Sequence, residues 1–138
     1  MENYSDPTFD YNIYKALSKK YARIDGQRQI KGTLGREHTI YSIQIIPREG
    51  YITKSEYKTV ERRYKDFEDL HNAIKEERKG IILPALPSKN IAIDLFLSSN
   101  TAPKDRKTEL ELYLNKLMTN TEVWDIDAFV DFITKVSL

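Results

Sequence analysis

Basic side chains gather around one short stretch of the chain where an anion could be held. Arg62, Arg63, Tyr64 and Lys65 join a β-type run to a helical run. Adjacent arginines offer planar N–H donors that suit a phosphate group, and the tyrosine offers a flat apolar face to a sugar-like ring. Taken alone, such a cluster is more often a solvated surface patch. The role of Arg62 is left open: it is a surface charge, a support for Asp66 or a ligand. Lys65 is expected to be solvated.

Two further basic residues lie where the chain can hold them in a fixed direction. Lys89 ends the segment 83–89, LPALPSK, whose two prolines restrict the backbone. Arg106 opens an amphipathic helical pattern four residues before Leu110. Together with the arginine cluster, these two residues favour an anion-binding site over a solvated surface patch.

Groups that could perform catalysis are not combined in a recognisable pattern. His38 and His71 lie far apart, without metal-ligand spacing, and His71 is expected to be a packing residue. Asp66 and Asp69 fall at a helix start, where capping explains them. The glycines of residues 32–35 are expected to connect two strands rather than to cradle a phosphate. We therefore expect no enzyme activity, no metal site and no cofactor.

The composition limits the class of protein further. The 138 residues suit one domain, and the formal net charge is only +1, so non-specific nucleic-acid binding is not expected. The chain has no cysteine, which excludes disulfides and thiol chemistry and fits the cytosol. Its first six residues, MENYSD, lack the basic and apolar regions of a secretory signal. No apolar run approaches the roughly 18 residues that span a bilayer.

Hydrophobic periodicity predicts three strands in the first half of the chain. Alternation over residues 38–46, and β-forming residues over 57–64, indicate two of them. An earlier strand is expected over residues 22–31, interrupted near Gly26. Short connections between them predict an antiparallel meander.

The period changes to that of a helix after the third strand. Asp66 is expected to cap a helix, and Gly80 is expected to lie just past its end. Residues 88–104 are expected to form a long loop with an apolar segment, and Trp124 to pack where two later helices meet. The apolar positions of the three helices are Phe67, Leu70 and Ile74; Leu110, Tyr113, Leu114, Leu117 and Met118; and Phe129, Phe132, Ile133 and Val136. The predicted class is α+β, with a three-stranded antiparallel meander packed against a helical subdomain that contains a proline-rich turn between helices.

The motifs described above resemble those of the phox-homology (PX) domain. The strand-to-helix sequence RRYKDF at 62–67, the turn LPALPSK at 83–89 and the helix that begins at Arg106 occur in the family's order. The resemblance runs from about residue 18, which divides the chain into an N-terminal tail, 1–17, and a PX domain, 18–138. The family fold is a three-stranded antiparallel sheet against a helical subdomain.

The resemblance implies a function and four site residues. PX domains bind phosphoinositide headgroups, most often phosphatidylinositol 3-phosphate. By position, Arg63 would hold the 3-phosphate, Tyr64 would stack under the inositol ring, and Lys89 would meet the 1-phosphate. Arg106 would bridge the 4- and 5-hydroxyls, which disfavours lipids phosphorylated there. The protein would then lie on the cytosolic face of endosomal or vacuolar membranes and take part in trafficking.

The apolar loop after Lys89 is the expected membrane edge. Ile91 and Ile93 are predicted to insert, and burying one such side chain contributes up to about 1.5–3 kcal/mol. The alternative, that both residues fold back onto the core, is left open. Leu95, Phe96 and Leu97 are expected to be core.

Three other interpretations are carried beside lipid binding. The PxxP spacing of residues 84–87 is one that SH3 domains recognise. The aromatic tail, 1–17, could recruit a trafficking protein partner, which would make the chain an interaction module with weak or no lipid binding. An enzyme that acts on phosphoinositides is the least favoured interpretation, because the pocket residues include no nucleophile or general base.

Overall fold

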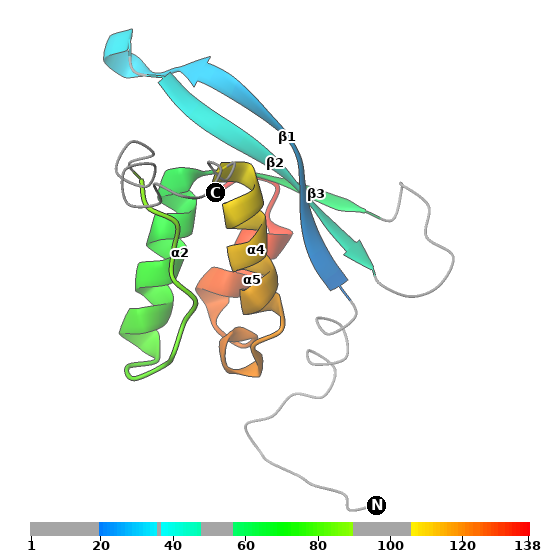
Figure 1. Cartoon of the computed structure of the whole chain (residues 1–138), viewed down its shortest axis with the longest axis vertical. Coiled ribbons are helices and arrows are strands. Elements are labelled where there is room, and N and C mark those ends of the chain that lie inside the picture. The colour runs from blue at the N-terminus through cyan, green and yellow to red at the C-terminus, as the bar shows by residue number, and fades with distance from the viewer. Residues whose placement is uncertain (1–19, 36, 48–56, 90–105) are drawn as a thin grey trace, which may run out of the picture.

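A three-stranded sheet lies against a group of helices in the computed structural model, which describes residues 20–35, 37–47, 57–89 and 106–138 (Figure 1). The sheet order is β1-β2-β3, and both pairings are antiparallel. The strands are β1 (Lys20–Lys31), β2 (Glu37–Pro47) and β3 (Lys58–Arg63). The helices are α2 (Tyr64–Glu77), α4 (Arg106–Met118) and α5 (Asp127–Thr134), with short 3₁₀ turns η1 (Thr33–Gly35) and η3 (Thr121–Val123). The predicted α+β class and antiparallel meander are confirmed.

The strands follow the alternation in the sequence. Tyr41, Ile43 and Ile45 of β2 are all buried, because every second side chain points to the face that the helices cover. The register of β1 against β2 shifts between Ile24 and Gly26, which confirms the interruption expected there. Residues 32–35 connect β1 to β2, as predicted.

Helix α2 begins three residues earlier than the sequence suggested. Asp66 was expected to be its N-cap, but the cap residue is Arg63, with an extended φ of −106°. Asp66 lies in the first turn, and its Oδ2 accepts the backbone N–H of Arg63 at 2.9 Å. The carboxylate thus stabilises the helix start from inside the first turn. Gly80, at φ 88°, follows the helix end as predicted.

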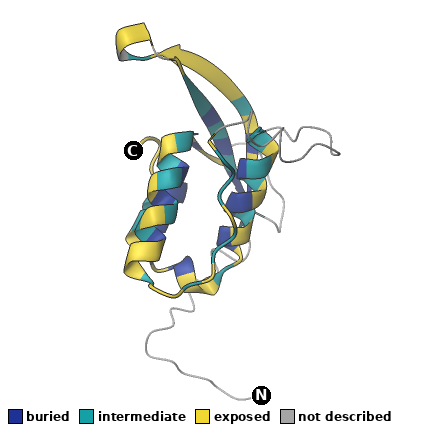
Figure 2. Cartoon of the chain, turned by 60° about the vertical axis from the view of Figure 1, so that its left-hand side comes forward, coloured by how far each residue is buried: buried dark blue, intermediate teal, exposed yellow. Residues whose placement is uncertain are grey.

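The core fills the space between the sheet and the three helices (Figure 2). Trp124 is buried between the last two helices, where its Nε1 donates to the carbonyl of Met118 at 3.0 Å, so the position predicted for it is confirmed. Val136 was predicted to continue the apolar face of the final helix, but α5 ends at Thr134 and Val136 is 67% exposed. Most of the outer end of the β1–β2 hairpin is exposed (Figure 2).

Helix α4 covers the free edge of β1 through two polar side chains. Asn115 accepts the N–H of Ala22 and donates to its carbonyl, both at 2.8 Å. Glu111 accepts the N–H of Ile24 at 2.7 Å. Because unpaired edge groups would otherwise be left under the helix, these bonds fix the position of α4 and of Arg106 at its start.

Candidate functional site

A cavity of about 510 Å³ lies where β3 passes into α2, between β2 and the start of α4. All four residues predicted to hold a headgroup line this cavity: Arg63, Tyr64, Lys89 and Arg106. They come from a helix cap, a helix start, the end of the proline turn and the start of another helix. The remaining lining residues are Glu37, His38, Thr39, Tyr41 and Lys65. The structure therefore brings the whole predicted set together, although 43 positions separate Arg63 from Arg106 in the sequence.

Tyr64 and Arg106 form the centre of the cavity wall. The guanidinium carbon of Arg106 lies 5.0 Å from the centroid of the Tyr64 ring, which is a cation–π contact. Arg106 Nη2 is buried and has no hydrogen-bond partner within the described parts of the chain. A buried donor of this kind usually has a partner, so the atom is available to an acceptor that enters the cavity.

The proline turn is held against the helices by Tyr64. The Tyr64 hydroxyl donates to the carbonyl of Pro87 at 2.7 Å. Leu83 and Leu86 of the same turn pack against the core. Lys89 follows Pro87 by two residues, and its exposed side chain reaches the cavity from that anchored backbone.

Arg63 and Lys65 lie on either side of Tyr64 and differ in their pairing. The Arg63 side chain is exposed and forms no ion pair within the described residues. Lys65 Nζ lies 2.8 Å from Asp69 Oδ1, and this contact raises the pKa of the lysine above its usual value. Lys65 is exposed, as expected, and it also borders the cavity.

Strand β2 supplies a wall of the cavity that the sequence did not reveal. Glu37, Thr39 and Tyr41 are alternate residues, so their side chains point to one face of the strand. The pairing of Ile40 with Arg63 places this wall beside the helix start. No motif marks these residues, because only the register between the two strands brings them to the site.

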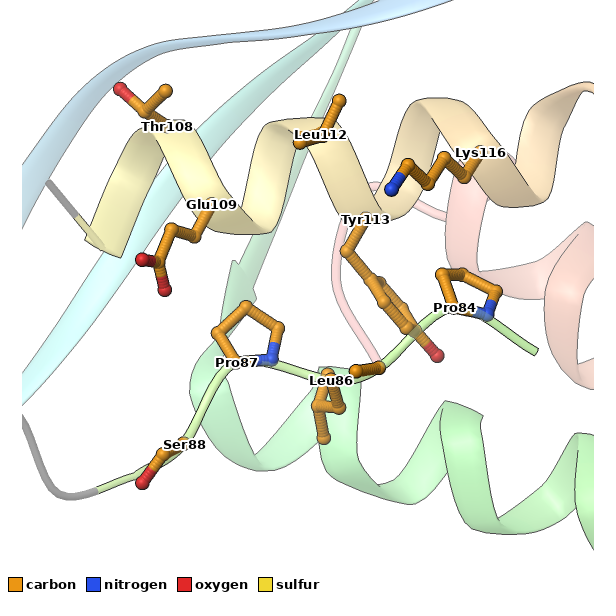
Figure 3. A pocket seen from close by; sticks show the side chains of 10 residues that line it. Pro84, Leu86, Pro87, Ser88, Thr108, Glu109, Leu112, Tyr113 and Lys116 are labelled. Carbon is orange, nitrogen blue, oxygen red and sulfur yellow. The ribbon is translucent and has the colours of Figure 1, made fainter. Parts of the chain in front are cut away.

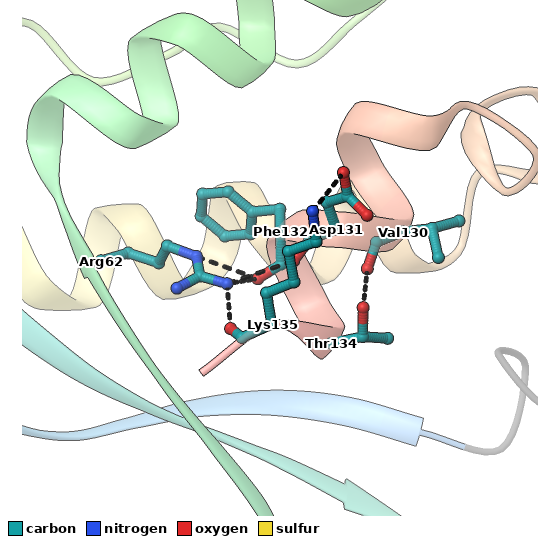
Figure 4. A network of polar contacts seen from close by, with 6 residues as sticks. All are labelled: Arg62, Val130, Asp131, Phe132, Thr134 and Lys135. Atoms are coloured by element: carbon teal, nitrogen blue, oxygen red, sulfur yellow. Dashed lines mark hydrogen bonds and ion pairs between the residues drawn. The ribbon is translucent and has the colours of Figure 1, made fainter. Parts of the chain in front are cut away.

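Arg62 has a structural role that differs from all three of the interpretations left open for it. The side chain is fully buried and its guanidinium hydrogen-bonds the C-terminal end of α5 (Figure 4). Nε donates to the Phe132 carbonyl at 3.0 Å and Nη2 to the same oxygen at 2.7 Å. Further acceptors are the carbonyls of Asp131, Lys135 and Val136.

These bonds satisfy carbonyl groups that a helix end leaves without partners. Burial lowers the pKa of the Arg62 guanidinium, while the charge of Asp66 opposes that shift. The signal that could have identified this role was strand alternation, because Val60 is buried and Arg62 lies on the same face of β3. Arg63, the next residue, is the cap of α2 and is exposed.

His71 is a packing residue, as expected. Its Nδ1 lies 2.7 Å from the hydroxyl of Tyr113, and the two rings are 5.7 Å apart. Burial, and then the charge of Lys75, lower the pKa of His71. Burial also raises the pKa of Tyr113. The pair joins α2 to α4 with a neutral hydrogen bond.

A second groove, of about 470 Å³, lies between the proline turn and α4 (Figure 3). Pro84, Leu86 and Pro87 form one side, and Leu112 and Tyr113 are on the other. Its charged lining residues are Glu109 and Lys116, one of each sign. This groove lacks the concentration of cations that distinguishes the first cavity, so it is the weaker candidate for an anion.

Two of the predicted site residues, Ile91 and Ile93, lie outside the described residues, as does the segment that contains Leu95, Phe96 and Leu97. Among the described residues, no group of acidic or histidine side chains is arranged to hold a metal ion. None of the helices in the described parts of the chain is both long and apolar enough to cross a bilayer.

Comparison with known proteins places this geometry in a family. The chain is 25% identical over 122 residues to vacuolar protein sorting-associated protein vps5 of Schizosaccharomyces pombe, across 86% of this chain and 20% of that protein. It is 30% identical over 117 residues to sorting nexin-41 of Eremothecium gossypii, across 80% of this chain and 18% of that protein. Sorting nexin 1 of Arabidopsis thaliana is 35% identical over 76 residues, 55% of this chain and 19% of that protein. The chain thus spans about a fifth of the length of these relatives.

Solved structures share the fold. A designed CISK-PX domain superposes with a TM-score of 0.56 at 24% identity, covering 81% of this chain and 96% of that one. The mouse SNX19 PX domain with bound sulphate ion gives a TM-score of 0.55 at 22% identity, covering 81% of this chain and 92% of that one. The family model described as PX domain matches residues 50–135. With that match over more than half of its length, the chain belongs to the PX domain family.

Proposed function

We propose that this chain is a phosphoinositide-binding module that targets its protein to membranes, and that its preferred lipid is phosphatidylinositol 3-phosphate. The observation that carries the proposal is the cavity beside Tyr64. Arg63, Lys89 and Arg106 converge there without an acidic partner among the described residues, and Arg106 presents a buried N–H that has no acceptor. Such a site favours a ligand that combines anionic groups with hydrogen-bond acceptors.

Each side chain has a role that its geometry and chemistry support. Arg63, at the cap of α2, offers a planar fork to the 3-phosphate beside the positive end of the helix dipole. Lys89 suits the 1-phosphate, where a movable point charge is sufficient. Tyr64 offers its ring to the inositol beside the guanidinium of Arg106.

Arg106 supplies the proposed selectivity. Its guanidinium is fixed by the start of α4 and by the Tyr64 ring, so it can bridge the 4- and 5-hydroxyls of the inositol. A phosphate at either position would crowd that guanidinium. The lipid favoured by this arrangement carries its phosphomonoester at the 3-position.

Co-sedimentation with liposomes across the phosphoinositide panel tests the proposal. The wild type should sediment selectively with phosphatidylinositol 3-phosphate, and Arg63→Ala should lose at least tenfold in affinity with its unfolding curve unchanged. Arg23→Ala is the matched control, because Arg23 is an exposed arginine of β1 and is not among the residues that line the cavity. Equal binding by the wild type and Arg63→Ala would refute the site.

Failure of the wild type to bind any phosphoinositide would refute lipid recognition and leave a protein-interaction module as the function. Pull-downs with and without residues 1–17 would then identify what the tail recruits. In either case the proposed domain extends from residue 18 to 138, so that it includes β1, and it acts by binding rather than catalysis.

The proposed location is the cytosolic face of endosomal or vacuolar membranes, where a lipid with a 3-phosphate would recruit the domain. A fluorescent fusion should leave these membranes when phosphatidylinositol 3-kinase is inhibited and when Arg63 is replaced by alanine. Membrane localisation that persists in both conditions would contradict this mode of recruitment.

A further inference from the structure

Charge is distributed unevenly along the cavity that contains Tyr64. The basic side chains of Arg63, Lys65, Lys89 and Arg106 surround the junction of β3 and α2. One carboxylate, that of Glu37, also lines the cavity. No acidic lining residue has been assigned a role in the proposed headgroup site.

Glu37 lies at the outer end of the cavity. Arg63 pairs with Ile40 across the sheet, and Glu37 is three residues further along β2, toward the hairpin. At the usual rise per strand residue, this places the Glu37 backbone about 10 Å from the level of Arg63. The one carboxylate of the cavity lining therefore lies away from the basic side chains at the junction of β3 and α2.

Within the described residues, the Glu37 carboxylate has no direct ion pair. Its cross-strand neighbour is Lys31, but the two side chains form no ion pair, and neither does any other described residue with Glu37. Glu37 is exposed, so it keeps its solvation in the free protein and acts on a ligand through its charge.

We propose that Glu37 sets an upper limit on the charge of the headgroup that the cavity accepts. This inference rests on the proposed function, because it concerns the same ligand. A headgroup with one ring phosphomonoester is matched by the cations near Tyr64. A second phosphomonoester on the ring adds negative charge inside the same cavity, where the Glu37 carboxylate repels it. Glu37 thus discriminates against doubly phosphorylated rings independently of Arg106.

The substitution Glu37→Gln tests this role, since it removes the charge and keeps the shape of the side chain. Titration calorimetry would use soluble headgroups, so that repulsion between Glu37 and a bilayer surface does not enter. The probes are inositol 1,3-bisphosphate and inositol 1,3,5-trisphosphate. Glu76→Gln is the matched control, because Glu76 is exposed near the far end of α2, roughly 18 Å along the helix from Tyr64.

We expect Glu37→Gln to improve the affinity for the trisphosphate relative to the bisphosphate by about five- to tenfold at low salt, from Coulomb repulsion at several Å in a solvated site. The gain should shrink at high salt, because ions screen exposed charges. Glu76→Gln should leave the affinity ratio unchanged.

Three results would overturn the inference in distinguishable ways. If the wild type binds the bisphosphate but Glu37→Gln leaves the affinity ratio unchanged, the role of Glu37 is refuted and the proposed function stands. If the wild type binds neither headgroup, the proposed function fails and the role of Glu37 fails with it. If Glu37→Gln and Glu76→Gln raised the relative affinity for the trisphosphate equally, the effect would come from net charge alone. That result would also refute the role of Glu37.

Discussion

Replacing Arg62 with alanine should destabilise the fold without removing the proposed headgroup site. Arg62 and Arg63 are neighbours in sequence with opposite environments. Arg62 is fully buried against α5, whereas Arg63 is exposed in the cavity. If the two arginines formed one basic cluster, Arg62→Ala and Arg63→Ala would have similar effects.

The magnitude follows from the groups that Arg62 satisfies. Alanine at this position removes the donors that reach the carbonyls of Asp131, Phe132, Lys135 and Val136. It also removes a cation–π contact in which the guanidinium carbon lies 5.2 Å from the Phe132 centroid. Leaving buried acceptors unsatisfied costs about 1–3 kcal/mol each, but water can reach the carbonyls that are only partly buried. We therefore expect a loss of about 3–5 kcal/mol in the free energy of unfolding.

Urea denaturation followed by tryptophan fluorescence measures this loss, because Trp124 is buried and lies just before α5. With a slope of about 2 kcal/mol/M, the midpoint should fall by about 2 M. Arg62→Lys should recover only part of the loss, since an ammonium cannot reproduce the planar fork of donors. Arg63→Ala should leave the midpoint unchanged. A change of less than about 1 kcal/mol in Arg62→Ala would refute the role assigned to the network.

Two further predictions concern the membrane edge and the effect of pH. Replacing Ile91 and Ile93 with serine should weaken liposome binding more than binding of a soluble headgroup, as measured by co-sedimentation and calorimetry; equal losses would favour a core role. Burial lowers the pKa of His71, so the folded state favours the neutral imidazole. The contribution of the neutral His71 side chain to the stability of the fold is retained above the unfolded pKa of about 6.5. The free energy of unfolding falls as the pH drops below that value. Urea unfolding between pH 7.5 and 5.5 should therefore show a steeper loss in the wild type than in His71→Gln, and parallel curves would contradict the assignment.

Local pattern was sufficient to predict most of the secondary structure. Alternation identified β2, and helical spacing identified the buried faces of α2 and α4, because these periods are set by backbone geometry alone. Helix ends were predicted less accurately. α2 begins at Tyr64 because Asp66 can accept the N–H of Arg63 from within the first turn, a bond that competes with capping by Asp66 itself.

The resemblance also selected the four residues that we propose hold a headgroup, and the structure gathers all of them around one cavity. It did not indicate that β2 contributes Glu37 and Thr39, since no local feature marks them. It also did not assign Arg62, whose partners lie about 70 positions away in α5. Long-range contacts of this kind depend on which elements pack together.

The sequence by itself therefore determined the order of elements, the apolar face of most of them, and the residue types that suit a phosphorylated ring. Only the tertiary structure decided which of two adjacent arginines serves the fold and which is free for a ligand. The physical reason is that successive side chains of a strand point to opposite faces, and the burial of one face is settled by what packs against it. In this chain the C-terminal end of α5 packs against Arg62, whereas Arg63, at the cap of α2, is exposed and lines the cavity.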